Sequence, residues 1–189
     1  MLAQKASIMS KFVVVYASET GNTRTVAEEI FSAIRVENKT IIDVRSFDGT
    51  MDADVWFVGF WVNHSTCSLE IIDLLSSLHG KHVAFFSTCG LSDSDDYYKR
   101  IENNVRAFLP EDNNYLGAFF CRGKMPSEIR RRYEEARGTF RETEQDAAYD
   151  DVLDRMIASF DDALTHPDKQ DLLKANIFVD EVFKTLGIR

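Results

Sequence analysis

One stretch decides the fold of this chain: the run VVYASETGNT, from Val14 to Thr23. Its first four residues belong to an apolar run, Phe12–Ala17, that is rich in valine and typical of a strand buried on both faces. It leads into Thr23–Ile34, where apolar residues recur at helical spacing. The free N–H groups and the dipole of a helix N-terminus attract anions. The stretch therefore predicts a strand, a tight anion-binding loop and a helix.

The donors of this loop are neutral. Ser18, Thr20 and Thr23 carry hydroxyl groups that can donate to phosphate oxygens. Gly21 permits a positive φ or a close backbone approach, and the loop contains no lysine or arginine. Such a loop suits a monophosphate held away from water, and it lacks the G-x-x-x-x-G-K-[ST] pattern of nucleotide triphosphate sites. An ordinary helix capped by serine or threonine is the alternative.

Apolar runs and amphipathic segments alternate on either side of this stretch. Strands are predicted at Phe12–Ala17, Thr40–Val44, Val55–Phe60, His82–Thr88 and Tyr115–Cys121, and helices at Thr23–Ile34, Leu69–Leu78 and Asp95–Leu109. Residues 46–54 are predicted to form a loop or a short turn. Because strands and helices alternate, right-handed crossovers and a parallel sheet follow. The pattern predicts an α/β fold with a flavodoxin-like, doubly wound, five-stranded sheet in the order 2-1-3-4-5.

The chain continues beyond the fifth strand. Helices are predicted at Pro126–Arg137, Asp146–Thr165 and from His166-Pro167-Asp168 to about Leu186, with Gly138–Gln145 as a connection. The last helix has the broadest apolar stripe, so we expect it to cover the sheet face beside the fifth strand. Residues 1–10 are interpreted as a leader and 11–189 as one domain, with 122–165 as a helical extension inserted before the last helix.

Composition excludes several classes of protein. The chain has 189 residues, 44% of them apolar, and a net charge of -9, so it can build a core and repels nucleic acid. The longest apolar run, Val55–Val62, is far shorter than the ~20 residues that cross a bilayer. The cysteines Cys67, Cys89 and Cys121 lack metal-ligand spacing and are expected to be reduced thiols. We therefore expect a cytoplasmic protein that binds neither nucleic acid nor membrane.

The first loop resembles the flavodoxin signature. The resemblance rests on apolar residues at 14 and 15, an aromatic residue at 16, a hydroxyl at 18, a small residue at 21, and then Thr23, Ala27 and an aliphatic residue at 30. With the strand alternation, it covers residues 11–121 and extends to the last helix. It implies a non-covalently bound FMN whose phosphate is held by Ser18, Glu19, Thr20, Gly21, Asn22 and Thr23.

The loop after the third strand is expected at the same sheet edge, because ligands of open α/β sheets bind beyond the carboxyl ends of the strands. Trp61 falls where flavodoxins often carry an aromatic residue that stacks on the flavin, although it also fits the end of a core strand. Flavodoxins resemble one another in having glycine next, where this chain has Val62, which is strained at positive φ. Either Asn63 supplies the flexible peptide that glycine provides in flavodoxins, or the partly reduced flavin is less stabilised in this chain than in flavodoxins.

The loop after the fourth strand is the third candidate. Gly90, beside Cys89, would let backbone N–H groups reach the pyrimidine edge of a flavin, as the resemblance implies. Tyr97 either covers the other face of the ring or packs within its helix. Three aspartates between 93 and 96 make this edge acidic. All three cysteines also fall at this edge, so a thiol relay is an alternative to unreactive thiols.

The extension begins with a basic cluster, Arg122, Lys124 and Arg130–Arg132. It is interpreted either as a rim over the flavin that contacts an acidic partner or a substrate carboxylate, or as an exposed helix whose arginines pair with its own glutamates. The run Cys121–Pro126 and the His-Pro-Asp helix start resemble a flavodoxin-like subgroup of anaerobic bacteria. Some members of that subgroup accompany reductases such as the one acting on bilirubin.

These features favour an electron carrier that uses FMN to deliver electrons to a partner reductase. No catalytic base, nucleophile or metal site accompanies the three loops in the sequence. The alternatives are an FMN-dependent reductase of NAD(P)H or quinones, in which the extension builds a substrate pocket, and a flavin-free interaction module. A response-regulator receiver is excluded, because the acidic pair expected near the first strand is missing.

Overall fold

The computed structural model describes residues 11–137 and 144–188. The leader proposed for residues 1–10 and most of the connection at 138–145 lie outside them. The strands are β1 (Phe12–Tyr16), β2 (Lys39–Asp43), β3 (Val55–Trp61), β4 (His82–Cys89) and β5 (Asn114–Arg122). The helices are α2 (Asn22–Ala33), α3 (Leu69–Ser77), α4 (Asp95–Arg106), α5 (Ser127–Ala136), α6 (Glu144–Ala163) and α7 (Lys169–Thr185), with a 3-10 turn, η1 (Val44–Ser46).

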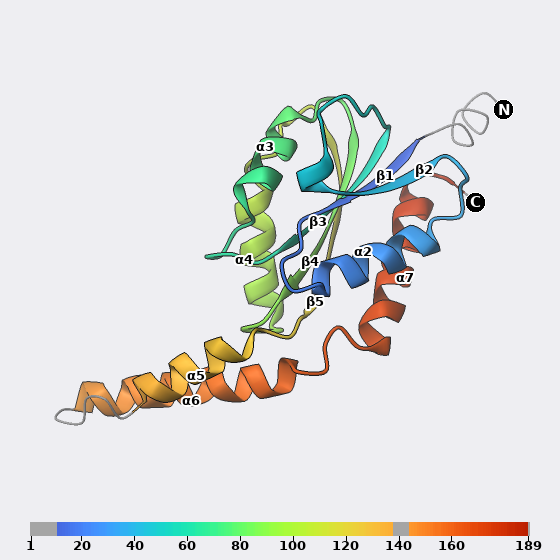
Figure 1. Ribbon diagram of the computed structural model, residues 1–189. Helices are drawn as coiled ribbons and strands as arrows, with labels where there is room; N and C mark the ends of the chain where they lie inside the picture. The colour runs from blue at the N-terminus through green and yellow to red at the C-terminus, as the bar shows by residue number, and fades with distance from the viewer. Residues whose placement is uncertain (1–10, 138–143, 189) are drawn as a thin grey trace.

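The five strands form one parallel sheet in the order β2-β1-β3-β4-β5, which confirms the predicted topology (Figure 1). All five residues of β1 are buried, because the sheet is covered on both faces. Val14 packs in the cluster that contains α2 and α7, whereas Val13 and Val15 pack in the cluster that contains α3 and α4. This two-sided burial explains why β1 is apolar at every position.

The last helix covers the sheet face beside β5, as the width of its apolar stripe predicts. Phe178 of α7 packs edge-on against Phe57 of β3, with ring centroids 6.3 Å apart, and stacks on Phe119 of β5 at 6.2 Å. Phe183 lies 5.3 Å from Phe12 at the start of β1. The helix therefore completes the core of the sheet, although 46 residues separate it from β5.

Most predicted boundaries differ from the structure by one to three residues, and two of these differences lie at the second strand and at the helix before β5. The second strand ends at Asp43 rather than Val44, because the Asp43 carboxylate accepts the Arg45 N–H at 3.0 Å and starts the 3-10 turn. Helix α4, which connects β4 to β5, ends at Arg106 rather than at Leu109. Residues 47–54 contain no helix in the structure, in line with the predicted loop.

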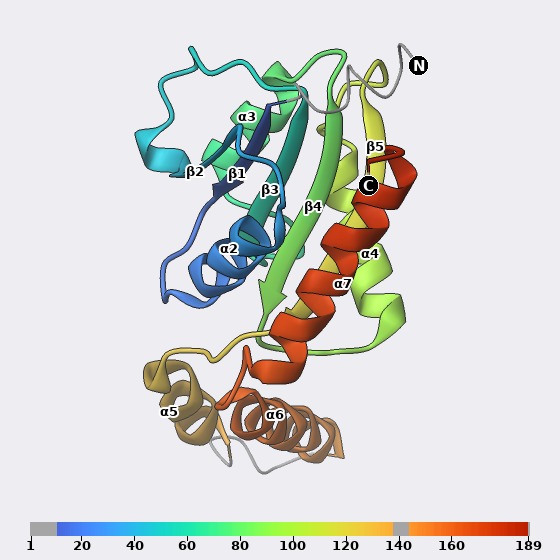
Figure 2. The same cartoon turned by 90° about the vertical axis from the view of Figure 1, so that its right-hand side faces the viewer.

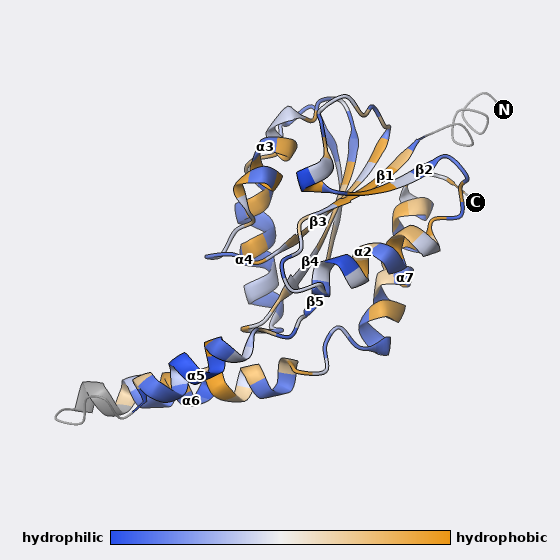
Figure 3. Ribbon diagram, in the orientation of Figure 1, coloured by the Kyte–Doolittle hydropathy of each residue, from blue (hydrophilic) through white to orange (hydrophobic). Residues whose placement is uncertain are grey.

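Helices α5 and α6 lie side by side beyond the carboxyl ends of the strands and project away from the sheet (Figures 1 and 2). All ten residues of α5 are described and none is buried, and Figure 3 shows the helix as mostly hydrophilic. Its ion pairs reach α6: Arg130 Nε lies 2.9 Å from Asp161 Oδ1, and Arg137 Nε lies 2.8 Å from Asp154 Oδ1. Ion pairs on the surface thus join α5 to α6. No helix within residues 11–137 and 144–188 has the length and apolar content that crossing a membrane requires.

Candidate functional site

A cavity of about 650 Å³ opens at the carboxyl edge of the sheet. Its walls come from the loops after β1, β3 and β4, which contribute Thr20, Trp61 and Gly90 among others, and from the start of the extension, which contributes Met125. The switch point of a doubly wound sheet is where such loops converge. The structure therefore brings together the three loops that the sequence singled out, and adds a fourth wall.

The loop after β1 opens into α2 at Gly21, whose φ is 90°. This left-handed conformation is readily available only to glycine. The N-cap residue is thus Gly21, so neither serine nor threonine stands at the N-cap position, although a serine hydroxyl outside it accepts one N–H of the first turn. Ser18 Oγ accepts the Arg24 N–H at 3.3 Å. The remaining N–H groups of the first turn lie at the loop, where a helix N-terminus favours negative charge.

The polar side chains of the loop have different surroundings. Thr20 is exposed and lines the cavity, whereas Asn22 is buried. Asn22 Nδ2 donates to Thr20 Oγ1 at 2.9 Å and to the Lys124 carbonyl at 2.8 Å. Thr23 is buried too, and its hydroxyl pairs with that of Thr88 at 2.9 Å. Thr23 therefore ties α2 to the end of β4. Thr20 is a hydroxyl residue of the loop that lines the cavity, whereas Ser18 and Thr23 do not line it.

Trp61 is partly exposed and lines the cavity, whereas the other six residues of β3 are buried. The alternative that it ends β3 inside the core is therefore wrong. Glu19 of the first loop faces the same cavity from an exposed position. The indole and the first loop thus border one space.

The residue after Trp61 does not take the strained conformation. Positive φ falls instead on His64 at 47° and Ser65 at 66°. The Asn63 N–H donates to the Thr66 carbonyl and the Thr66 N–H to the Asn63 carbonyl, both at 2.9 Å. The Asn63 peptide groups are therefore already engaged in a tight turn, so Asn63 is a poor source of a freely rotating peptide. The Val62 N–H is likewise bonded, to the Thr88 carbonyl at 3.0 Å.

The loop after β4 lies against the extension. Gly90 lines the cavity, and a Cβ atom at this position would lie 2.3 Å from Met125 Cγ. Tyr97, on α4, also lines the cavity, and burial raises its pKa to about 12. The Arg100 guanidinium lies 5.5 Å from the centre of the Tyr97 ring. Tyr97 thus reaches the cavity while remaining part of its helix.

The three thiols are buried and unpaired. Burial raises the pKa of Cys67 to about 11 and that of Cys89 to about 12, and it raises the pKa of Cys121 well above its usual value. Cys89 Sγ donates to the Ser92 carbonyl at 3.3 Å and to the Cys121 carbonyl at 3.6 Å. Because thiolates carry thiol chemistry, these surroundings favour unreactive thiols over a relay.

The extension contributes to the site in a way that sequence reasoning missed. Met125, Pro126, Ile129 and Tyr133 line the cavity. The only available signal was the pair Ile129 and Tyr133, two apolar residues four positions apart in an otherwise polar helix. The fourth wall of the cavity is thus mainly apolar.

Most of the basic cluster is paired. Arg130 bonds to Glu134 and Asp161, and Arg131 bonds to Glu135. Arg122, whose side chain is 12% exposed, donates to Ser159 Oγ at 3.0 Å and lies within 3.7 Å of Asp93 and Asp162. Arg130 and Arg131 therefore fit the alternative in which the arginines of the helix pair with its own glutamates. Arg130 also pairs with Asp161 of α6.

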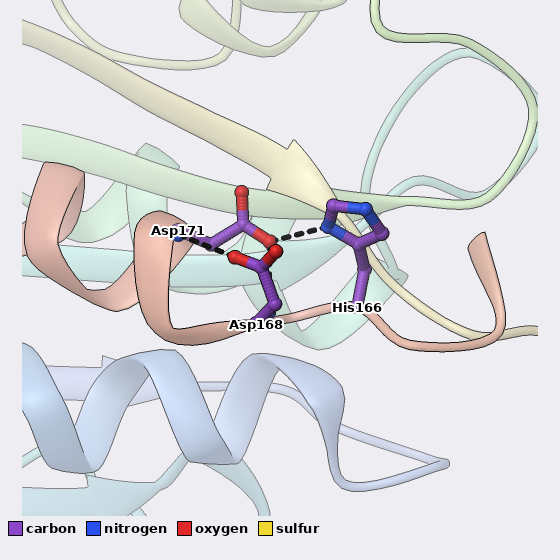
Figure 4. Close-up of side chains that lie close together, drawn as sticks. All are labelled: His166, Asp168 and Asp171. Carbon is purple, nitrogen blue, oxygen red and sulfur yellow. Dashed lines mark hydrogen bonds and ion pairs between the residues drawn. The ribbon is translucent and has the colours of Figure 1, made fainter. Parts of the chain in front are cut away.

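A second polar cluster lies where α7 begins. His166 Nδ1 lies 2.5 Å from Asp171 Oδ2, and the carboxylates of Asp168 and Asp171 form a reciprocal capping box (Figure 4). The Asp171 carboxylate accepts the Asp168 N–H at 2.9 Å, and Asp168 Oδ1 accepts the Asp171 N–H at 2.9 Å. Ligand atoms of the three residues lie within 4.8 Å of one another. Both carboxylates already serve the helix N-terminus, so the cluster is accounted for by the start of α7.

The fold and the cavity define a doubly wound α/β protein with a ligand site at its switch point. Residues 13–180 match the flavodoxin domain family, and the chain belongs to that family. It is 30% identical over 172 residues to the flavodoxin-like domain-containing protein BilS of Clostridioides difficile (strain CD3), covering 89% of this chain and 93% of the relative. It is 28% identical over 179 residues to the protein of the same description from Clostridium symbiosum (strain WAL-14163), covering 86% and 90%.

Solved flavodoxins share the fold. A flavodoxin from Streptococcus pneumonia TIGR4 superposes with a TM-score of 0.56 at 13% identity, covering 93% of this chain and 99% of that one. An archaeal flavodoxin superposes with a TM-score of 0.53 at 15% identity, covering 94% and 99%. At these identities the comparison establishes the architecture, which agrees with the strand order given above.

Proposed function

We propose that this protein binds FMN non-covalently in the carboxyl-edge cavity and delivers electrons from it to a partner reductase. One observation carries the proposal: the loop that leads into α2 at Gly21, whose φ is 90°, borders a cavity of about 650 Å³ through Thr20 and Asn22, and Trp61 lines the same cavity. The volume falls within the range of about 300–1,000 Å³ that is common for cofactor sites. Neutral phosphate donors at one end and aromatic walls at the other suit a flavin mononucleotide.

Each group has a definite task in this proposal. The first-turn N–H groups of α2, with the hydroxyls of Ser18 and Thr20, hold the phosphate. Trp61 and Tyr97 flank the ring system and exclude water from it, and the backbone at Gly90 meets its pyrimidine edge. Bound FMN supplies electron transfer, which no side chain of the chain itself provides. Asn22 and Thr23 keep the phosphate loop in place through their bonds to Lys124 and Thr88.

The apolar part of the cavity wall supports a carrier role. Cys89 is the thiol that lines the cavity, and its raised pKa leaves it protonated at neutral pH. Val62, Met125, Pro126 and Ile129 offer only apolar surface. Such a wall shields and orients a ring but neither adds nor removes protons. The chemistry of a final acceptor would then belong to a partner, and a reductase is the partner class that we propose.

The absorbance spectrum of the purified protein tests the cofactor. We expect a yellow protein with flavin bands that releases FMN, identified by chromatography, when it is denatured. A colourless protein that also stays colourless after incubation with excess FMN and removal of the free flavin would overturn the proposal. Riboflavin, which lacks the phosphate, serves as the control ligand and is expected to bind more weakly.

The apolar wall from α5 gives a second candidate specific support. Met125, Ile129 and Tyr133 extend the cavity beyond what the three family loops enclose, as expected of an FMN-dependent reductase with its own substrate pocket. Steady oxidation of NADH or NADPH by the isolated flavin-loaded protein, with a quinone as acceptor, would favour this candidate. Reduction of the flavin by dithionite without turnover of either nucleotide would favour the carrier.

A further inference from the structure

We propose that Lys124, contributed by the extension, supplies the positive charge that pairs with the phosphate group held at Ser18–Thr23. The inference rests on the proposed FMN site and deepens it. The phosphate loop itself contains no lysine or arginine, so its donors are neutral. A cation next to this loop would have to come from elsewhere in the chain, and the segment that follows β5 is in contact with it.

The backbone at Lys124 is fixed directly against the phosphate loop. Its carbonyl accepts Asn22 Nδ2 at 2.8 Å, and the same Nδ2 donates to Thr20 Oγ1 at 2.9 Å. The preceding residue, Gly123, is buried, and a Cβ atom there would lie 2.9 Å from Asn22 Nδ2. The Gly123 N–H donates to the Cys89 carbonyl at 3.0 Å. Glycine is therefore required for the close approach that brings Lys124 to the loop.

The other side of Lys124 is fixed as well. Its N–H donates to the His166 carbonyl at 3.0 Å. His166 is anchored by Asp171, and Asp171 belongs to the capping box that starts α7, as Figure 4 shows. The position of Lys124 is thus set by backbone bonds on both sides, and none of these bonds uses its ammonium group.

Lys124 borders the space in which a phosphate is expected. Lys124 lines the main cavity of about 650 Å³ and also a smaller one of about 220 Å³, and Thr20 and Asn22 line both. The smaller cavity reaches Gly21 and Thr25, at the first turn of α2. The residue therefore stands at the junction of the two spaces that border the phosphate loop.

Lys124 is also available for such a contact. Within residues 11–137 and 144–188, no carboxylate forms an ion pair with it, whereas its neighbours Arg122 and Arg130 are both paired. Its side chain is exposed and free to turn toward the loop. A hydrogen bond between charged groups is stronger than one between neutral groups, so the ammonium would add to the neutral donors already present.

The experiment compares two flavins in two proteins. Lys124→Met keeps the length and apolar stem of the side chain and removes its charge. Titrations that follow flavin fluorescence would give the Kd of FMN and of riboflavin for the unaltered protein and for the variant. We expect the Kd of FMN to rise about 10-fold to 100-fold, the range for a hydrogen bond to a charged group, while the Kd of riboflavin is unchanged.

Two variants serve as controls. Lys124→Arg retains the charge and should keep the FMN affinity close to that of the unaltered protein. Lys184→Met removes one positive charge from the last turn of α7, far from the loop, and should leave both affinities unchanged. Circular dichroism would show that each variant is folded, and since the bonds of Lys124 are made by its backbone, we expect all three to fold.

The outcomes separate this inference from the function on which it rests. Unaltered protein that binds neither flavin refutes the proposed function. If it binds FMN and Lys124→Met binds FMN equally well, or loses FMN and riboflavin to the same degree, Lys124 does not pair with the phosphate. As a second readout, added salt should weaken FMN binding more in the unaltered protein than in Lys124→Met, because only the unaltered protein has the attraction that salt would screen. The same salt dependence in both proteins would also overturn the inference.

Discussion

Replacing Asn22 by alanine should uncouple the phosphate loop from the extension. Its side chain is 7% exposed and bridges the Thr20 hydroxyl and the Lys124 carbonyl, at 2.9 Å and 2.8 Å. The bond to Lys124 joins residues that are 102 positions apart in the chain. Asn22→Ala removes both bonds, leaves the Lys124 carbonyl without this donor, and opens space beside Gly123.

The size of the effect follows from the two bonds. Each contributes about 0.5–1.5 kcal/mol net, so the free energy of unfolding should fall by about 1–3 kcal/mol. For a chain of this size, each kcal/mol corresponds to about 2–4 °C in Tm. If restoring the loop costs the variant half of that energy on binding, FMN affinity falls about 2-fold to 13-fold.

The assay measures both quantities on the same protein. Urea unfolding of the flavin-free protein gives the stability, and flavin titration gives the affinity. Asn113→Ala is the matched control, because Asn113 Nδ2 donates to the carbonyls of Leu78 and Pro110 at 2.7 Å and 3.0 Å, next to the start of β5 at the opposite sheet edge. It should lose at least as much stability, because Asn113 Oδ1 also accepts the Lys81 N–H at 2.9 Å, and it should keep its FMN affinity. If both variants bind FMN alike, Asn22 does not couple the extension to the site.

Three further predictions concern the walls of the site and its support. Gly90→Ala should lower the free energy of unfolding by about 1–3 kcal/mol, because the new Cβ would overlap Met125. Urea unfolding should show that the double variant Gly90→Ala, Met125→Ala recovers most of this loss. If it recovers none, the strain does not come from the contact with Met125. The three buried thiols, whose pKa values are raised, should react with an aromatic disulfide reagent at pH 8 only after unfolding, and rapid modification of the folded protein would contradict their burial. The Asp171 N–H lowers the pKa of Asp168, so the stability that this carboxylate contributes is present above its ordinary range and is lost as the pH falls through the lowered value. In Asp168→Asn, the urea midpoint should therefore fall less steeply with decreasing pH than in the unaltered protein. An equally steep fall in both proteins would exclude this role for Asp168.

The sheet was predictable because the hydrophobic pattern of a strand or helix extends over all of its residues. A strand buried on both faces must be apolar at every position, and β1 is. The conformation of the loop before α2 was predictable for a local reason, since a positive φ at a tight turn before a helix favours glycine, and Gly21 has a φ of 90°. Both inferences depend on residues that are close together in the sequence.

Side-chain partners far apart in the chain were not predictable. Nothing near Thr23 indicates that its hydroxyl turns to Thr88, 65 residues away, rather than toward the loop. The same holds for Met125, which lies against Gly90 only because β5 ends beside β4. The turn at His64–Ser65 was missed for another reason: its positive φ values fall on residues that seldom adopt them.

The extension is joined to the site at both ends of the cavity, and this limits how a partner can approach. Asn22 ties the segment after β5 to the phosphate loop, and Ser159 of α6 donates to the Leu91 carbonyl at 2.7 Å, in the loop after β4. Arg122 in turn donates to Ser159. A protein that took electrons from a flavin in this cavity would meet α5 and α6 beside the ring, because both helices lie beyond the carboxyl ends of the strands (Figure 2). The surface that selects the partner would then include the extension, whereas the loops shared with other flavodoxins would hold the cofactor.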